Sequence, residues 1–136
     1  MIIDVYKLYI RSVLEYCSVA FHSSLTEEQS GALEAVQTMA LKVCLGSMFV
    51  SPSVAREMTG IDLLKVRREA RLSRFCVRAS KHPRHSKMFP LNPESEYNLR
   101  HCDKFKVNYA CTESYRRSAL IKCQQKLNEL AKEGKI

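Results

Sequence analysis

Apolar residues in the first third of the chain recur every three or four positions, the spacing that puts side chains on one face of an α-helix. The first series predicts a helix that closes near His22, with an apolar face of Ile3, Tyr6, Ile10, Val13, Cys17 and Ala20. A second helix begins after Thr26, which forms a capping box with Gln29, and Gly46 is its expected end. Its predicted buried stripe is Leu33, Val36, Ala40 and Val43.

Start and stop signals predict three more helices. Ser51 before Pro52 opens a short helix that Gly60 closes. Asp62 caps a helix that should reach about Ser80, and Thr112 begins the last one. Residues 82–111 contain three prolines and no sustained period, with "KFKVNYA" as the one alternating stretch. We therefore expect an all-α fold, a small bundle of about five helices, organised as a helical thumb-like region 1–81, an irregular basic connector 82–111 and a C-terminal helix 112–136.

The fourth predicted helix carries a row of positive charges. At 100° per residue its cations fall within an arc of about 80°, and they are Arg67, Arg71, Arg74, Arg78 and Lys81. An apolar flank lies roughly 100° away on the same helix, formed by Leu64, Phe75, Ala79 and Leu72. Like charges at this spacing repel one another by a few tenths of a kcal/mol per pair. The row therefore calls for an explanation.

Charge is unevenly distributed along the chain, which has a net charge of +8. Residues 61–136 hold 18 Lys and Arg against 8 Asp and Glu, whereas residues 1–60 hold 4 against 6. This asymmetry is typical of a protein whose basic half faces a polyanion, such as an RNA or DNA backbone. Arg116 and Arg117 would support the row. Two alternatives stay open: the row docks an acidic protein partner, or Arg stems cover apolar surface while acids of the same fold neutralise the heads.

Six cysteines and four histidines raise the question of metal binding. His82, His85, His101, Cys102 and Cys111 supply zinc-type ligands within the irregular segment, but their spacing fits no paired zinc pattern. We expect no cofactor, reduced thiols and an intracellular location, in the nucleus or the cytoplasm. No segment reads as a membrane span, and we expect a monomer.

Catalytic patterns are missing from the sequence. Four scattered glycines do not form a phosphate-binding loop, and Asp4, Asp62 and Asp103 stand in unlike contexts. No nucleophile elbow frames a Cys and a His. We therefore predict no catalytic residue and no catalytic activity for this chain alone.

The segment from Tyr6 to Val43 resembles the region beyond the palm in reverse transcriptases of LINE-type non-LTR retrotransposons, of the jockey and CR1 kind. The matching residues are Tyr6, Lys7, Ile10, Arg11, Val13, Leu14, Glu15, Tyr16, His22, Leu25, Thr26, Leu33, Glu34, Val36, Gln37 and Leu41. Downstream, "RLSRFCVRASKHPRHSKMFPLN" and "TESYRRSAL" resemble later motifs of the same family. The matches extend over residues 4–128.

The resemblance implies the thumb-side and C-terminal part of a larger RNA-directed DNA polymerase. In that family this part grips the nucleic acid while upstream polymerase domains carry out nucleotide addition. Its function would be sequence-independent binding of the nucleic-acid backbone. The residues expected to bind are Arg67, Arg71, Arg74, Arg78 and Lys81, supported by Arg116 and Arg117. The alternatives are a helical protein-interaction module and an inactive open-reading-frame relic of a transposable element.

Overall fold

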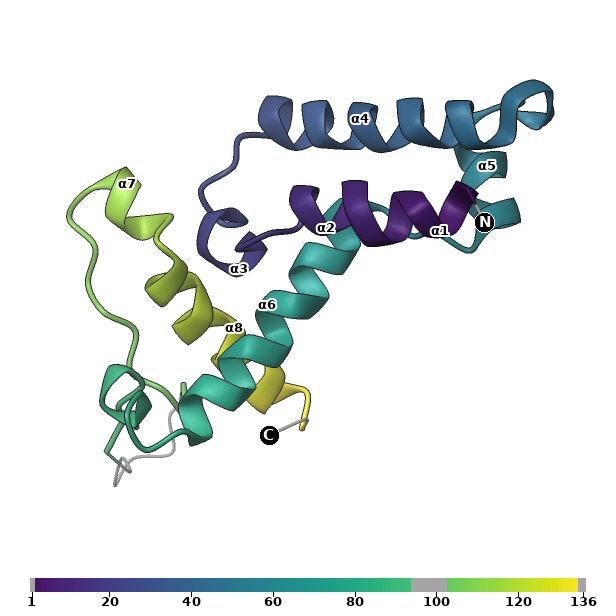
Figure 1. Ribbon diagram of the computed structural model, residues 1–136. Helices are drawn as coiled ribbons and strands as arrows, with labels where there is room; N and C mark the ends of the chain where they lie inside the picture. Colours follow the sequence, from purple (N-terminus) through teal and green to yellow (C-terminus); the bar gives the residue numbers. More distant parts are fainter. Residues whose placement is uncertain (1, 94–102, 135–136) are drawn as a thin grey trace. The chain divides into compact units, whose positions relative to one another are not determined.

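The computed structural model describes residues 2–93 and 103–134 (Figure 1). It is 69% helical, and its described residues contain no strand, only an isolated antiparallel bridge between Leu91 and Phe105. The all-α prediction is confirmed. The chain divides into two compact units, Met1–Ala70 and Arg71–Ile136, and the division falls within α6 (Leu64–Lys81).

The N-terminal segment is not the single helix predicted to close near His22. It consists of short pieces, which are α1 (Ile2–Val5), the π-helical turn η1 (Tyr6–Ile10), α2 (Arg11–Leu14) and α3 (Ser18–Phe21). Cys17, between α2 and α3, has a left-handed φ of 50°, which no helix continues through. The break lies where the periodic pattern showed no interruption.

The π-helical turn also changes which side chains are buried. A π turn adds one residue to the helical repeat, so side chains after it rotate away from the face set before it. Tyr6 is buried as predicted, but Ile10 and Val13 are exposed. Glu15 and Ser18 are buried in their place. The predicted apolar face therefore holds only up to the turn.

α4 (Glu27–Leu45) begins and ends as predicted. Thr26 accepts a hydrogen bond from the Gln29 backbone N–H, and the Gln29 side chain accepts one from the Thr26 N–H. Gly46 follows the helix with a positive φ of 54°. The buried side chains are Ser30, Gln37 and Leu41, whereas the expected Val36 and Val43 are exposed. The buried face of α4 is therefore rotated from the predicted one, and the polar residue Gln37 lies at its centre.

After the 3₁₀ turn η2 (Gly46–Met48), α5 (Pro52–Thr59) follows its predicted signals, with Ser51 as the N-cap and Gly60 in the left-handed conformation after its end. Figure 1 shows α1 and α2 alongside α4. The apolar core of the first unit gathers between these elements, with Tyr6, Leu41, Ala55 and Ile61 fully enclosed.

A chain of hydrogen bonds crosses this core. The Tyr6 hydroxyl donates to Gln37 Oε1 at 2.8 Å, and Gln37 Nε2 donates to the carbonyl oxygen of Asp62 at 3.0 Å. Glu34 Oε1 accepts from the backbone N–H of Lys65 at 2.8 Å, so a side chain of α4 caps the first turn of α6. These bonds hold the start of α6 against α4 within the first unit.

Burial of Tyr6 predicts a loss of stability at alkaline pH. Removal from water raises the pKa of the Tyr6 hydroxyl to about 12 from its ordinary value of 10.0. Between these values the unfolded chain has lost a proton that the native chain retains, so the free energy of unfolding falls by about 1.4 kcal/mol per pH unit. Chemical denaturation at pH 9, 10, 11 and 12 measures this slope.

Tyr6→Phe is the control for this titration, because it removes the ionising group and leaves every other Tyr and Lys in place. The variant should lose less stability than the wild type between pH 10 and pH 12. Parallel pH profiles of the two proteins would show that Tyr6 is ionised as easily in the native chain as in the unfolded one.

In the second unit, the later turns of α6 face α8 (Ala119–Lys132). Cys76 of α6 and Cys123 of α8 are buried and form a thiol–thiol hydrogen bond, which together with burial raises the pKa of Cys76. The cysteines of the described residues carry no disulfide, and Cys102 lies outside them. The predicted last helix is divided, because α7 (Glu113–Arg116) stops before α8 begins.

The irregular segment is held to α8 by two polar side chains. Asn128 accepts from the Phe105 backbone N–H and donates to the Phe105 carbonyl oxygen, at 2.8 and 2.9 Å. Gln124 Nε2 donates to the carbonyl oxygen of Met88, at the end of the 3₁₀ turn η3 (Ser86–Met88), at 2.9 Å. The described part of the irregular segment thus satisfies some of its backbone hydrogen-bonding groups through the neighbouring helix.

Candidate nucleic-acid interface

Arg67, the first member of the predicted basic row, is engaged within the first unit. Its Nε donates to Glu15 Oε1 at 2.7 Å, and the Glu15 side chain is only 1% exposed. This hydrogen bond to a carboxylate raises the pKa of Arg67. Because the guanidinium is needed to compensate a buried charge, Arg67 is not available to a phosphate.

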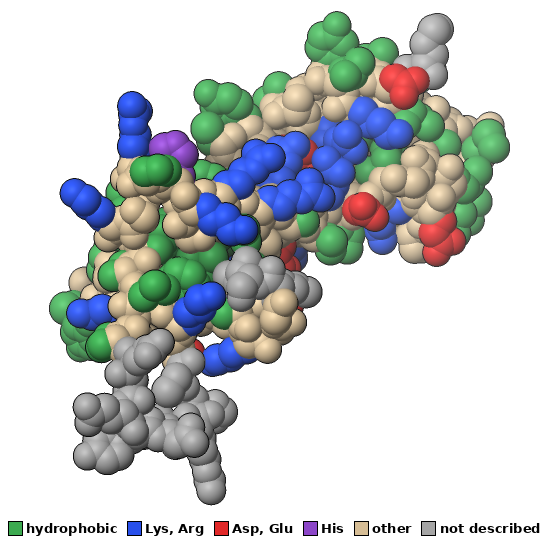
Figure 2. Space-filling model, turned by 90° about the horizontal axis from the view of Figure 1, so that it is seen from below, with side chains coloured by type: hydrophobic (Ala, Val, Ile, Leu, Met, Phe, Trp, Pro, Cys, Tyr) green, Lys and Arg blue, Asp and Glu red, His purple; other side chains and the backbone are tan. Residues whose placement is uncertain are grey.

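Three other members of the row are exposed on the part of α6 that belongs to the second unit, namely Arg74, Arg78 and Lys81. None of them has an ion pair with any residue that the structure describes. Arg71 is exposed too, but it already has an interaction partner. Lys and Arg side chains, coloured blue, are exposed on the face of the protein that Figure 2 draws. The row is therefore shorter than the sequence predicted.

Arg74 and Arg78 border a shallow surface hollow of about 360 Å³. Val77 and Ser73 of α6 and Leu130 of α8 complete its lining. Residues four apart on a helix are neighbours on its surface, so Arg74 and Arg78 present their side chains to the same hollow. Their fork of N–H donors suits the oxygens of a phosphate.

Arg116 and Arg117, expected to support the row, share one carboxylate. Arg116 Nη1 lies 3.2 Å from Glu113 Oε2 and Arg117 Nε lies 3.0 Å from Glu113 Oε1. Both arginines are about half exposed, so these pairs contribute little to stability. They reduce the net charge that this turn presents to a polyanion from two to one.

The apolar flank of α6 differs from the prediction at one position. Leu64, Leu72 and Ala79 are buried as expected, but Phe75 is 47% exposed. Its place is taken by Cys76, which contacts α8. Phe75 stands at the border between the basic row and the buried face of the helix.

Sequence reasoning missed Arg68, whose side chain is fully buried in the first unit. Its Nη2 donates to the Ser30 hydroxyl at 2.8 Å, and burial lowers its pKa while the negative charges of Glu34 and Glu15 oppose that shift. A signal existed, because Arg68 lies midway between Leu64 and Leu72 on the i, i+4 line of the buried face. A count of charges does not distinguish a buried arginine such as Arg68 from the exposed arginines of the same helix.

The predicted zinc ligands are partly observable. The rings of His82 and His85 lie 5.1 Å apart between centroids, and the His82 Nδ1 accepts a hydrogen bond from the Arg84 backbone N–H. Cys111 is exposed, whereas His101 and Cys102 lie outside the described residues. Within residues 2–93 and 103–134, no three His, Cys, Asp or Glu side chains are arranged to hold a metal ion.

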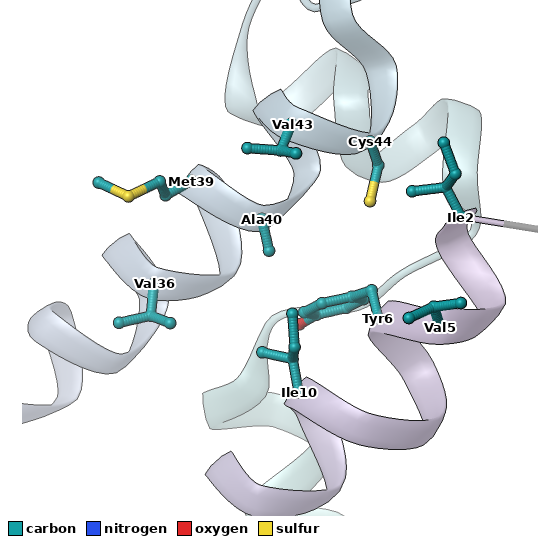
Figure 3. Close-up of a pocket in the computed structure, with 9 residues that line it drawn as sticks. All are labelled: Ile2, Val5, Tyr6, Ile10, Val36, Met39, Ala40, Val43 and Cys44. Atoms are coloured by element: carbon teal, nitrogen blue, oxygen red, sulfur yellow. The ribbon is translucent and has the colours of Figure 1, made fainter.

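The first unit has an apolar groove of about 310 Å³ between its N-terminal helices and α4 (Figure 3). Ile2, Val5, Tyr6 and Ile10 form one wall, and the other wall comes from Val36, Met39, Ala40, Val43 and Cys44. Val43 is 74% exposed. Three of the four residues that the periodic pattern had assigned to the buried stripe of α4, namely Val36, Ala40 and Val43, thus line this groove.

In the described part of the chain, no one helix has the length and apolar character to cross a membrane. A bent pair, Glu27–Met48 with Pro52–Thr59, meets the length and composition criterion only when its two parts are taken together, and they meet at 82°.

Comparison of the chain with protein-family models, with curated proteins and with solved structures finds no match. The residues behind the resemblance to LINE-type reverse transcriptases can nevertheless be placed. Tyr6, Glu15, Glu34 and Gln37 each make a hydrogen bond that ties two elements of the first unit together. In this chain, those motif residues have structural roles.

Proposed function

We propose that the second unit binds the phosphate backbone of RNA or DNA without sequence preference, as the non-catalytic C-terminal part of a LINE-type reverse transcriptase. The single observation that carries the proposal is the exposed trio Arg74, Arg78 and Lys81 on one side of α6, with two of its members at a surface hollow. The resemblance to the polymerase family supports it. Nucleotide addition would belong to upstream domains.

The charge of the second unit supports the same function. Residues 71–136 contain 15 Lys and Arg against 6 Asp and Glu, a net charge of +9, whereas residues 1–70 contain 7 against 8. A cationic surface that contacts phosphates releases condensed counterions, which makes affinity high at low salt. Contacts of this kind position a protein on nucleic acid without reading bases.

A salt series tests the proposal. Anisotropy of a labelled 20-base-pair duplex of arbitrary sequence is measured against the chain between 50 and 300 mM salt. If three cations contact phosphates, the plot of log affinity against log salt should have a slope of about −3. A second duplex of unrelated sequence should give the same line. An affinity independent of salt, or no binding at 50 mM, would contradict the proposal.

The apolar groove of the first unit favours a second candidate function, protein interaction through a helical module. An amphipathic helix of a partner would lay its apolar face between α4 and the N-terminal helices, as helix-in-groove complexes do. Sedimentation of the wild type and of Val43→Lys tests whether the groove binds a second copy of this chain. Self-association through the groove would be lost in the variant. An unchanged monomer in both would leave the groove to a different protein or to none.

A further inference from the structure

We propose that a pocket in the second unit receives one unpaired nucleobase, which makes single-stranded nucleic acid the preferred ligand of the basic face. The pocket has a volume of about 200 Å³ and an almost entirely apolar lining. α6, the segment around η3 and α8 form its walls, with Phe75, Ala79, His85, Met88, Phe89 and Cys123 among its residues. The inference rests on the proposed backbone binding and specifies its substrate class.

The rim of the pocket offers aromatic and thioether groups to a flat ligand. Phe75 is 47% and Met88 is 53% exposed, so both reach the entrance, and His85 is exposed beside them. The ring of His82 lies 5.1 Å from that of His85. Aromatic rings such as those of Phe75 and His85 stack on any base, because every base has a π face.

Contacts within the second unit fix the walls of the pocket. Gln124 of α8 holds the Met88 carbonyl oxygen at 2.9 Å, which fixes the wall that η3 supplies. Phe89 and Cys123 are buried and form the floor. A site that needs little rearrangement loses less affinity to the ordering of its own side chains.

Exposed cations stand close in sequence to the residues that line the pocket, on α6 and around η3, which favours a nucleotide over an apolar protein side chain as its ligand. On α6, Arg78 lies three residues after Phe75, so the two share neighbouring positions on the helix surface. On the other wall, Arg84 and Lys87 are exposed on either side of His85. An apolar pocket between cations matches a base joined to a phosphate on each side.

An abasic strand separates the pocket from the backbone contacts. Anisotropy is measured with labelled 12-nucleotide single strands at one salt concentration, one with bases and one that is abasic at every position. Both carry the same phosphates. We expect the strand with bases to bind about 5- to 100-fold more tightly, the effect of one stacked base. Equal, salt-dependent binding of the two strands would overturn the pocket assignment and leave the backbone proposal standing.

Phe75→Leu locates the effect, because leucine keeps apolar packing and removes the ring. The variant should bind both strands with nearly equal affinity, while its salt dependence stays that of the wild type. Tyr109→Leu is the matched control, since Tyr109 is 86% exposed and lies outside the pocket lining. If Phe75→Leu kept the preference for bases, or Tyr109→Leu lost it equally, the pocket would not be the site. Absence of binding by any strand would overturn the backbone proposal and this inference together.

Discussion

Replacing Gln37 by alanine should lower the free energy of unfolding of the first unit by about 3 kcal/mol. Gln37 is 1% exposed, and its amide accepts from the Tyr6 hydroxyl and donates to the Asp62 carbonyl oxygen. The substitution leaves both partners without their bond and opens a cavity beside them. Urea denaturation at pH 7 measures the change.

Met39→Ala is the matched control for this substitution, because Met39 is on the same helix and 69% exposed. It should change stability by no more than about 0.5 kcal/mol. A double-mutant cycle with Tyr6→Phe then isolates the Tyr6–Gln37 bond, for which we expect a coupling energy of about 1 kcal/mol. If Gln37→Ala lowered the free energy of unfolding by less than about 1 kcal/mol, the hydrogen bonds of Gln37 to Tyr6 and Asp62 would not be a main determinant of the unit's stability.

Replacing Arg74 and Arg78 together by glutamine should weaken duplex binding roughly 50-fold at 0.1 M salt. Each phosphate contact contributes about one unit to the slope of log affinity against log salt, so two lost contacts should reduce the slope by about two. Both side chains are exposed, and stability should change little. The salt series on the duplex measures affinity and slope together.

The double variant Arg116→Gln with Arg117→Gln is the matched control, because it also removes two positive charges from the second unit, at a different place. Glu113 already pairs with both arginines, so this control should reduce the slope by about one or less. If the two double variants lost affinity equally, binding would depend on net charge alone and the row on α6 would have no special role.

Local signals in the sequence predicted helix boundaries well where a single residue decides them. The capping box of Thr26 and Gln29, the Ser51–Pro52 start and the turn at Gly60 all stand where they were expected. These features depend on backbone groups within three or four positions, and their chemistry is complete in a short peptide. The break at Cys17 and the turn at Tyr6–Ile10 had no such signature.

Predictions of which face is buried were less successful, because burial depends on what the rest of the chain brings near. Val36 and Val43 suit a core by composition, yet α4 turns Gln37 inward to bond Tyr6 and Asp62. Arg67 and Arg74 are alike in the sequence. Arg67 forms an ion pair with the buried Glu15, 52 positions earlier, whereas Arg74 pairs with no acid among the described residues.

The sequence alone determined the helical character of the chain, most helix ends and the concentration of positive charge after residue 60, since these follow from local propensity and residue counts. Tertiary structure decided which cations remain exposed, which arginine is buried and where Phe75 stands. The physical reason is that an ion pair or a buried contact joins residues distant in sequence, and spacing along one helix carries no information about its partner.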